Sequence, residues 1–145
     1  MGVFDAKWVQ PLAEVLGDLG CSHALVVHGV DGLDEITLTG DSHIAELKNG
    51  KVKTYKLDPD ELGLEICFSD ELKGGTPEEN AKMIEGVLNG EKGPKRDIVL
   101  LNSAAAIYVA GKAKSLELGV QCAVESIDSG KARGKLEELC KISNA

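Results

Sequence analysis

The chain has 145 residues, of which 43% are hydrophobic, and its 24 acidic against 16 basic residues give a formal net charge of -8. This acidic balance argues against a nucleic-acid-binding surface, because binding to phosphate backbones depends on clustered Lys and Arg. No apolar run approaches the roughly 20 residues that cross a bilayer, so no membrane contact is expected. The four cysteines lack Cys-x-x-Cys spacing, which predicts reduced thiols in a cytoplasmic protein.

The N-terminal part of the chain predicts a helix followed by a buried strand. Apolar side chains such as Trp8 and Leu12 recur at helical spacing over residues 5–19, and Gly20 is expected to end the helix. Residues 22–27 form a nearly unbroken apolar run, which predicts a strand that is covered on both faces inside a sheet.

Two adjacent carboxylates, Asp34 and Glu35, follow this strand on a glycine-rich turn. Gly29 and Gly32 allow positive φ and close backbone approach, so the turn can present both side chains into a crevice. Mg²⁺ is usually held by one or two carboxylates together with substrate phosphates, which makes the pair a candidate metal site. The residues leave a second interpretation open, a pair of solvated surface charges. His28 next to the turn is either a donor to this site or a structural hydrogen-bonding residue.

A hairpin is predicted next, because Asn49-Gly50 separates residues 44–48 from residues 51–57 and favours a type I′ turn. It is expected at the edge of the sheet, with Val52 and Tyr55 near the covered side. The lysines of its second strand would then discourage pairing with other chains; they are Lys51, Lys53 and Lys56. Asp58 and Pro59 can begin a single helical turn.

The second half of the chain predicts helices over residues 76–90, 94–111, 115–128 and 132–142. The first is preceded by residues 74–76, whose backbone N–H groups offer a less favoured anion site. The basic residues Lys92, Lys95 and Arg96 are expected to be solvated, while Asn102 and Ser103 are expected to pack between helices without chemistry. This element order predicts an α/β fold in which a short sheet with a hairpin is covered by several helices, as a single unit over residues 1–145.

Several segments of the chain resemble the anthranilate phosphoribosyltransferase family, in its order and at its spacing. They are residues 2–5, 11–16, 28–40, 74–81 and 100–111. The resemblance covers essentially the whole chain and implies the C-terminal portion of a phosphoribosyltransferase/nucleoside-phosphorylase-type α/β domain. The family's phosphate-cradling Gly-Thr-Gly-Gly-Asp loop, its Lys-His-Gly-Asn segment and its anthranilate-contacting Arg do not occur in these residues. The helical N-terminal domain and the first half of the α/β domain are therefore expected to be absent.

The resemblance also implies a reaction and its participants. In the family, the pair that corresponds to Asp34 and Glu35 ligates the Mg²⁺ that accompanies the diphosphate of phosphoribosyl diphosphate. The complete enzyme transfers the phosphoribosyl group to the nitrogen of anthranilate in tryptophan biosynthesis, and no nucleophilic catalytic residue is implied for this chain. The resemblance implies a homodimer for the complete enzyme, whereas apolar surface left exposed on the fragment favours self-association.

We expect the isolated chain to be inactive, because the groups that cradle phosphate and contact anthranilate are not among its residues. One alternative is a non-catalytic interaction module or a complementing half of a split enzyme. A less favoured alternative is a relative of the pyrimidine nucleoside phosphorylases. The phosphorylase alternative is less favoured because one segment resembles the anthranilate enzymes specifically. This segment is Gly32-Leu33-Asp34-Glu35.

Overall fold

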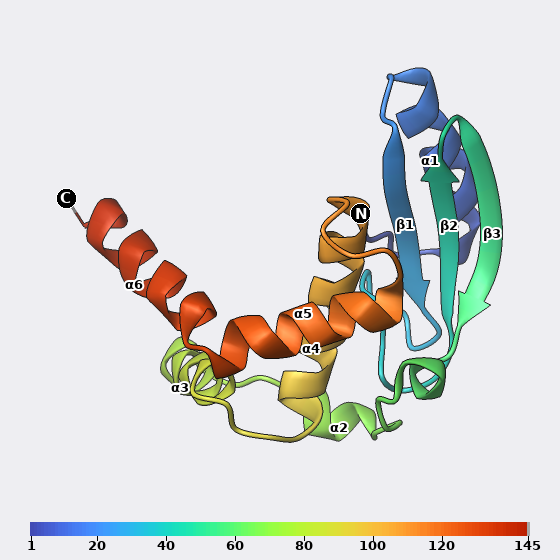
Figure 1. The fold of residues 1–145 in the computed structure, drawn as a ribbon. Helices are drawn as coiled ribbons and strands as arrows, with labels where there is room; N and C mark the ends of the chain where they lie inside the picture. The colour runs from blue at the N-terminus through green and yellow to red at the C-terminus, as the bar shows by residue number, and fades with distance from the viewer. Residues whose placement is uncertain (145) are drawn as a thin grey trace.

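A computed structural model describes residues 1–144 as a short sheet with helices on both of its faces (Figure 1). The three antiparallel strands lie in the order β1-β2-β3, which agrees with the predicted α/β class. In chain order the elements are η1 (Ala6–Trp8), α1 (Val9–Asp18), β1 (His23–Gly29), β2 (Ser42–Lys48), β3 (Lys51–Leu57), η2 (Pro59–Leu62), α2 (Ser69–Leu72), α3 (Pro77–Leu88), α4 (Pro94–Val109), α5 (Leu116–Asp128) and α6 (Lys131–Ser143).

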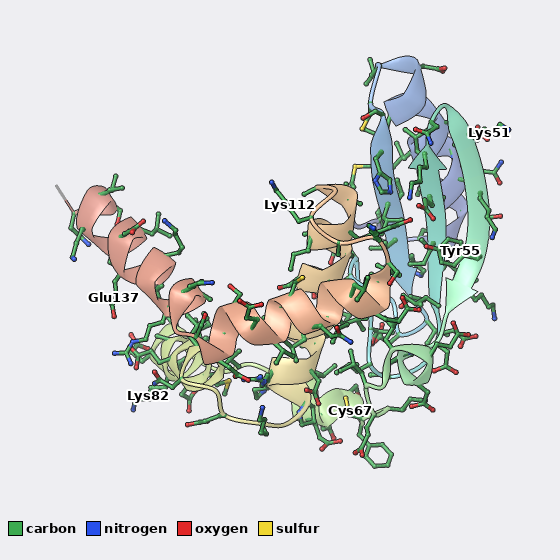
Figure 2. All side chains as sticks on the ribbon, in the orientation of Figure 1. Lys51, Tyr55, Cys67, Lys82, Lys112 and Glu137 are labelled. Carbon is green, nitrogen blue, oxygen red and sulfur yellow. The ribbon has the colours of Figure 1, made fainter. Side chains whose placement is uncertain are left out.

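The predicted hairpin is confirmed as β2 and β3. Asn49 and Gly50 adopt φ values of 51° and 73°, which are the positive values that a type I′ turn requires. Strand β3 lies at the edge of the sheet, and Lys51 projects from it into solvent (Figure 2). Val52 and Tyr55 are both half-buried, but they pack against opposite faces of the sheet rather than one covered side. Their odd separation along the strand is the reason, since side chains alternate between faces.

Strand β1 is an edge strand of the sheet, so the prediction that it lies inside a sheet is wrong in this respect. Its faces are nevertheless buried, as the apolar run predicts. Residues 1–3 lie parallel to its free edge: Val3 N–H donates to the Val27 carbonyl at 3.0 Å, and Val27 N–H donates to the Met1 carbonyl at 2.9 Å. An unbroken apolar run predicts that both faces of a strand are covered, but it does not predict whether the strand has neighbours on both edges.

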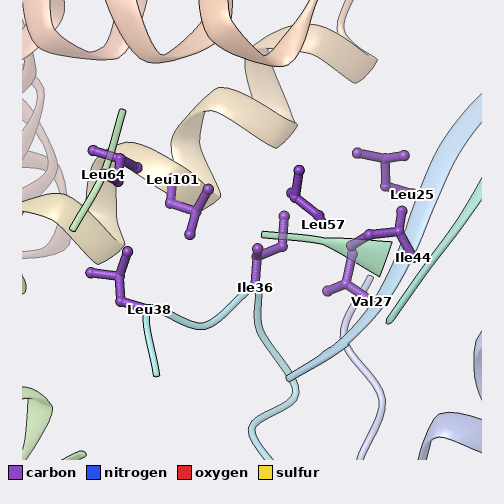
Figure 3. Packing of buried hydrophobic residues seen from close by; sticks show 8 residues of the cluster. All are labelled: Leu25, Val27, Ile36, Leu38, Ile44, Leu57, Leu64 and Leu101. Atoms are coloured by element: carbon purple, nitrogen blue, oxygen red, sulfur yellow. The ribbon is translucent and has the colours of Figure 1, made fainter. Parts of the chain in front are cut away.

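The hydrophobic core is divided by the sheet. On one face, α1 packs against β1 and β2 through the α1-side cluster, which consists of Val3, Val9, Ala13, Val26 and Ala45. On the other face lies the α4-side cluster (Figure 3), which consists of Leu25, Val27, Ile36, Leu38, Ile44, Leu57, Leu64 and Leu101. The α4-side cluster joins the sheet, the loop after β1 and helix α4 into one packed unit.

The predicted helices of the second half are confirmed, and side-chain caps mark the first residues of two of them. The Thr76 side chain accepts the Glu79 N–H, while Glu79 accepts the Thr76 N–H, so α3 begins with a capping box. At the start of α5 the Ser115 side chain accepts the Leu118 N–H, a single cap without the return bond. The four-residue helix α2 was not predicted, because a single turn is too short to show a period.

Arg96 is buried, so the expectation that the basic residues around it are all solvated is wrong. Only 2% of its side chain is exposed, and its Nη1 donates to Oδ1 of Asp128 at 2.7 Å. This ion pair ties the start of α4 to the end of α5, and it holds the pKa of Asp128 below its ordinary value. Arg96 lies on the buried side of a helix, which a count of nearby basic residues does not reveal.

Apolar side chains remain exposed at several places. Phe4, Leu19, Phe68 and Ile142 are each at least 75% exposed. Helix α6, which carries Ile142, extends away from the sheet (Figure 1). None of the helices described for residues 1–144 combines the length and the apolar character needed to cross a membrane. All four cysteines are free thiols.

Candidate metal site

The candidate metal-ligating residues lie on the loop that connects β1 to β2. Asp34 and Glu35 are exposed, whereas the next three residues, Ile36, Thr37 and Leu38, are at most 1% exposed. The hydrogen bonds and ion pairs described for residues 1–144 engage neither carboxylate. The pair therefore stands at the point where the loop leaves solvent and enters the core, with its oxygens open to a ligand.

Asp31 organises the turn that precedes the pair. Its Oδ2 accepts the hydroxyl protons of Thr37 at 2.6 Å and Thr39 at 2.8 Å, and its Oδ1 accepts the Leu33 N–H at 3.2 Å. Partial burial acts to raise the pKa of Asp31, but these donors outweigh it and hold the pKa below the ordinary value. Asp31 is thus committed to holding the loop and is not a free ligand.

Asn102 of α4 holds the loop backbone directly after the pair, although it was expected to have only a packing role. Its Oδ1 accepts the Ile36 N–H at 3.0 Å, and its Nδ2 donates to the Ile36 carbonyl at 2.8 Å. The same Nδ2 donates to the Ile98 carbonyl at 3.1 Å, one turn earlier in α4. A polar side chain on the apolar side of a predicted helix is the sequence signal that could have identified it.

Two further contacts hold the N-terminal segment, one against the loop and one against the end of β1. Gly2 lies so close to the Asp34 carbonyl that a Cβ at this position would overlap the carbonyl oxygen. His28 Nδ1 donates to the Val3 carbonyl at 2.8 Å, which gives this ring a structural hydrogen bond. Asp34 and Asn102 also line one cavity of about 270 Å³, between the edge of β1 and α4.

The donor set fits Mg²⁺ only as part of a larger coordination shell. Within residues 1–144 no cluster of three or more His, Cys, Asp or Glu side chains is arranged to hold a metal ion. Asp34 and Glu35 can supply two carboxylates, which is what Mg²⁺ commonly takes from a protein when waters and substrate phosphates complete its octahedron. The pair thus fits a cation that arrives with a phosphorylated ligand.

The less favoured anion site at residues 74–76 is occupied by the chain's own side chains. Oδ1 of Asn80 accepts the Gly75 N–H at 2.7 Å, and Oε2 of Glu79 accepts the Thr76 N–H at 2.8 Å. These amides are therefore not available to a phosphate group, and the acidic first turn of α3 opposes an anion as well.

Comparison with known proteins points to one family. Residues 1–133 match the model of a family described as glycosyl transferase family, a/b domain. The anthranilate phosphoribosyltransferase of Bradyrhizobium sp. is 52% identical over 145 residues, which make up 100% of this chain and 43% of the relative. That of Petrotoga mobilis is 50% identical over 144 residues, covering 99% of this chain and 42% of the relative.

Solved structures show the same likeness. The anthranilate phosphoribosyltransferase of Thermus thermophilus superimposes with a TM-score of 0.90 at 44% identity, covering 99% of this chain and 42% of that one. The enzyme of Saccharomyces cerevisiae in complex with PRPP and Mg gives a TM-score of 0.83 at 29% identity, covering 94% of this chain and 40% of that one. The present chain spans about two fifths of the length of the relatives it matches.

Proposed function

Because this chain belongs to the glycosyl transferase family, a/b domain, we propose that it is the C-terminal portion of an anthranilate phosphoribosyltransferase. The complete enzyme would transfer a phosphoribosyl group from phosphoribosyl diphosphate to the nitrogen of anthranilate, a step of tryptophan biosynthesis. The observation that carries the proposal is the exposed pair Asp34 and Glu35, whose carboxylates take part in no hydrogen bond within residues 1–144, on a loop that is otherwise tied to the core.

The share of this chain in the reaction is to bind and orient the diphosphate end of the donor. Asp34 and Glu35 would hold Mg²⁺ through their carboxylates, leaving the remaining positions to water and to diphosphate oxygens. A bound Mg²⁺ supplies Lewis-acid stabilisation of the negative charge that develops on the departing diphosphate. Asp31 keeps the turn in shape beneath the pair, because the hydroxyls of Thr37 and Thr39 converge on one of its oxygens.

The isolated chain should not turn over substrate. Two carboxylates satisfy only part of an octahedral shell, so cation binding without a phosphorylated ligand should be weak. Placing the reacting atoms needs groups that hold the ribose, the phosphates and anthranilate together. Those groups are expected in the three fifths of the relatives' length that this chain does not span.

The experiment measures Mn²⁺ binding to the purified chain by electron paramagnetic resonance, with and without inorganic diphosphate. We expect diphosphate to strengthen Mn²⁺ binding, and the double variant Asp34→Asn/Glu35→Gln to weaken the diphosphate-dependent binding by about tenfold, equivalent to roughly 1.4 kcal/mol. The matched control is Asp60→Asn/Glu61→Gln, which neutralises another exposed adjacent Asp-Glu pair and should bind as the wild type does.

Two results would contradict the proposal. Equal loss of binding in both double variants would show that the site is only general negative charge. Consumption of anthranilate by the purified chain with phosphoribosyl diphosphate and Mg²⁺ would contradict the expected inactivity. If neither double variant changes Mn²⁺ binding, the metal role is wrong, and a non-catalytic interaction module becomes the better interpretation of the exposed apolar side chains.

A further inference from the structure

We propose that Asn102 is a positioning residue for the Asp34–Glu35 pair. This inference rests on the proposed function, since it concerns the same cation site. Asn102 belongs to α4 and lies 66 residues along the chain from Ile36, the residue that immediately follows the pair. Its side-chain hydrogen bonds all go to backbone groups, so it acts through the backbone of the loop.

The Asn102 amide satisfies both backbone polar groups of a single loop residue. It accepts the Ile36 N–H at 3.0 Å and donates to the Ile36 carbonyl at 2.8 Å, so Ile36 is held as if it were paired with a neighbouring strand. Only 1% of Ile36 is exposed, so water is poorly placed to replace either bond. Of the side chains, only Asn and Gln join a donor and an acceptor in one rigid amide, and Gln is longer by a methylene.

The amide is itself oriented by α4. Its second donated bond goes to the Ile98 carbonyl at 3.1 Å, which selects the flip that turns Oδ1 toward the Ile36 N–H. The preceding helix residue, Leu101, is buried in the α4-side cluster together with Ile36. Helix α4 and the loop are therefore joined by apolar packing and by hydrogen bonds. The hydrogen bonds from Asn102 set the orientation of the loop backbone at Ile36.

The backbone contacts on either side of the pair make this orientation important for binding a cation. The Asp34 carbonyl lies against Gly2, and the Ile36 backbone is bonded to Asn102, so the backbone is fixed immediately before and after Glu35. Two neighbouring carboxylates bind one cation well only if their directions converge, and a supporting group that holds them costs affinity when it is lost. Loss of Asn102 frees the backbone at Ile36 and lets the two carboxylates diverge.

The chain contains a matched control for this arrangement. Asn80 of α3 accepts the Gly75 N–H at 2.7 Å and donates to the Gly75 carbonyl at 3.2 Å, which is the same pair of hydrogen bonds to the backbone of one residue. Asn80 is also half-buried, but it holds the loop before α3 and not the loop after β1. Asn80→Ala thus removes the same chemistry from a place where the proposal predicts no effect on the pair.

The test compares Asn102→Ala, Asn102→Leu and Asn80→Ala with the wild-type chain in two measurements. Amide hydrogen exchange across residues 33–38 should become about 10- to 100-fold faster in both Asn102 variants, because buried Ile36 groups are left unpaired. Binding of Mn²⁺ in the presence of inorganic diphosphate should weaken by about tenfold in the same variants. Asn80→Ala should change neither. Should Asn102→Leu fail to fold, Asn102→Ala decides, because it adds no volume.

Each outcome bears on a different claim. Unchanged exchange across residues 33–38 in the folded Asn102 variants would overturn the inference. Faster exchange with wild-type Mn²⁺ binding would also overturn it, provided that Asp34→Asn/Glu35→Gln still weakens binding, because Asn102 would then be structural only. If the Asp34→Asn/Glu35→Gln variant binds Mn²⁺ as the wild type does, the proposed function fails. In that case positioning for a cation fails with it, whatever the exchange shows about Asn102.

Discussion

Replacing Asp31 with Asn should destabilise the fold by about 1–2 kcal/mol at pH 7. Hydrogen bonds to a charged acceptor contribute roughly 1.5–3 kcal/mol against about 1 kcal/mol for neutral ones, and the Thr37 and Thr39 hydroxyls both donate to Oδ2. The Asn amide would also turn its N–H₂ group toward the Leu33 N–H, which now donates to Oδ1. Because Asp31 is partly exposed to solvent, its hydrogen bonds are weakened by competing water. The expected loss therefore lies near the lower end of the range obtained by adding the two hydrogen-bond differences.

The pH dependence gives this prediction its sharpest test. Because the pKa of Asp31 is lowered in the folded chain, its contribution is fully present above the unfolded-state pKa and is lost as the pH falls through the folded-state value. In urea titrations at pH 7, the free energy of unfolding should therefore be lower for Asp31→Asn than for the wild type. This difference in free energy should become smaller toward pH 3. Asp60→Asn, at an exposed position, should show neither effect. A difference that stays constant between pH 7 and pH 3 would refute the argument.

Two further substitutions test the packing around the loop. Leu101→Ala should reduce the free energy of unfolding by about 2–5 kcal/mol in urea titrations, because Leu101 is only 1% exposed. The control Leu139→Ala, at a position that is 62% exposed, should change the free energy of unfolding by less than about 0.5 kcal/mol. Gly2→Ala should cost about 1–3 kcal/mol and shift the amide resonance of Asp34, because its methyl group overlaps the Asp34 carbonyl. Gly134→Ala in α6 adds a methyl group that, within residues 1–144, meets nothing within 4 Å apart from its chain neighbours and the backbone of its own helix, and it should stabilise the chain by up to about 1 kcal/mol. Equal effects of the two glycine substitutions would contradict the packing argument.

Local patterns were sufficient for most of the secondary structure. The type I′ turn at Asn49 and Gly50 and the capping box at Thr76 and Glu79 depend on residues that are neighbours in the chain. Their conformational preferences do not need tertiary structure to be expressed. The position of Asp34 on a glycine-rich turn follows from the same kind of local information.

Long-range partners account for what the sequence did not reveal. Asn102 and Arg96 both sit on α4, and each finds its partner in a distant element, the loop after β1 and the end of α5 respectively. Helical periodicity identifies the side of a helix that is buried, but it does not identify which element covers that side. The position of β1 at the edge of the sheet is of the same kind, because strand order depends on how the whole chain is arranged.

The path of residues 1–3 along β1 has a practical consequence for labelling the protein. The amino group of Met1 donates to the Leu25 carbonyl at 2.7 Å, and an added residue would place a peptide N–H in the same position. An affinity tag fused before Met1 would then be directed along the strand edge toward His23, beside the cavity that Asp34 lines. A tag or fluorophore attached after Asn144 begins at the end of α6, which extends away from the sheet, and leaves the loop of the candidate metal site undisturbed (Figure 1).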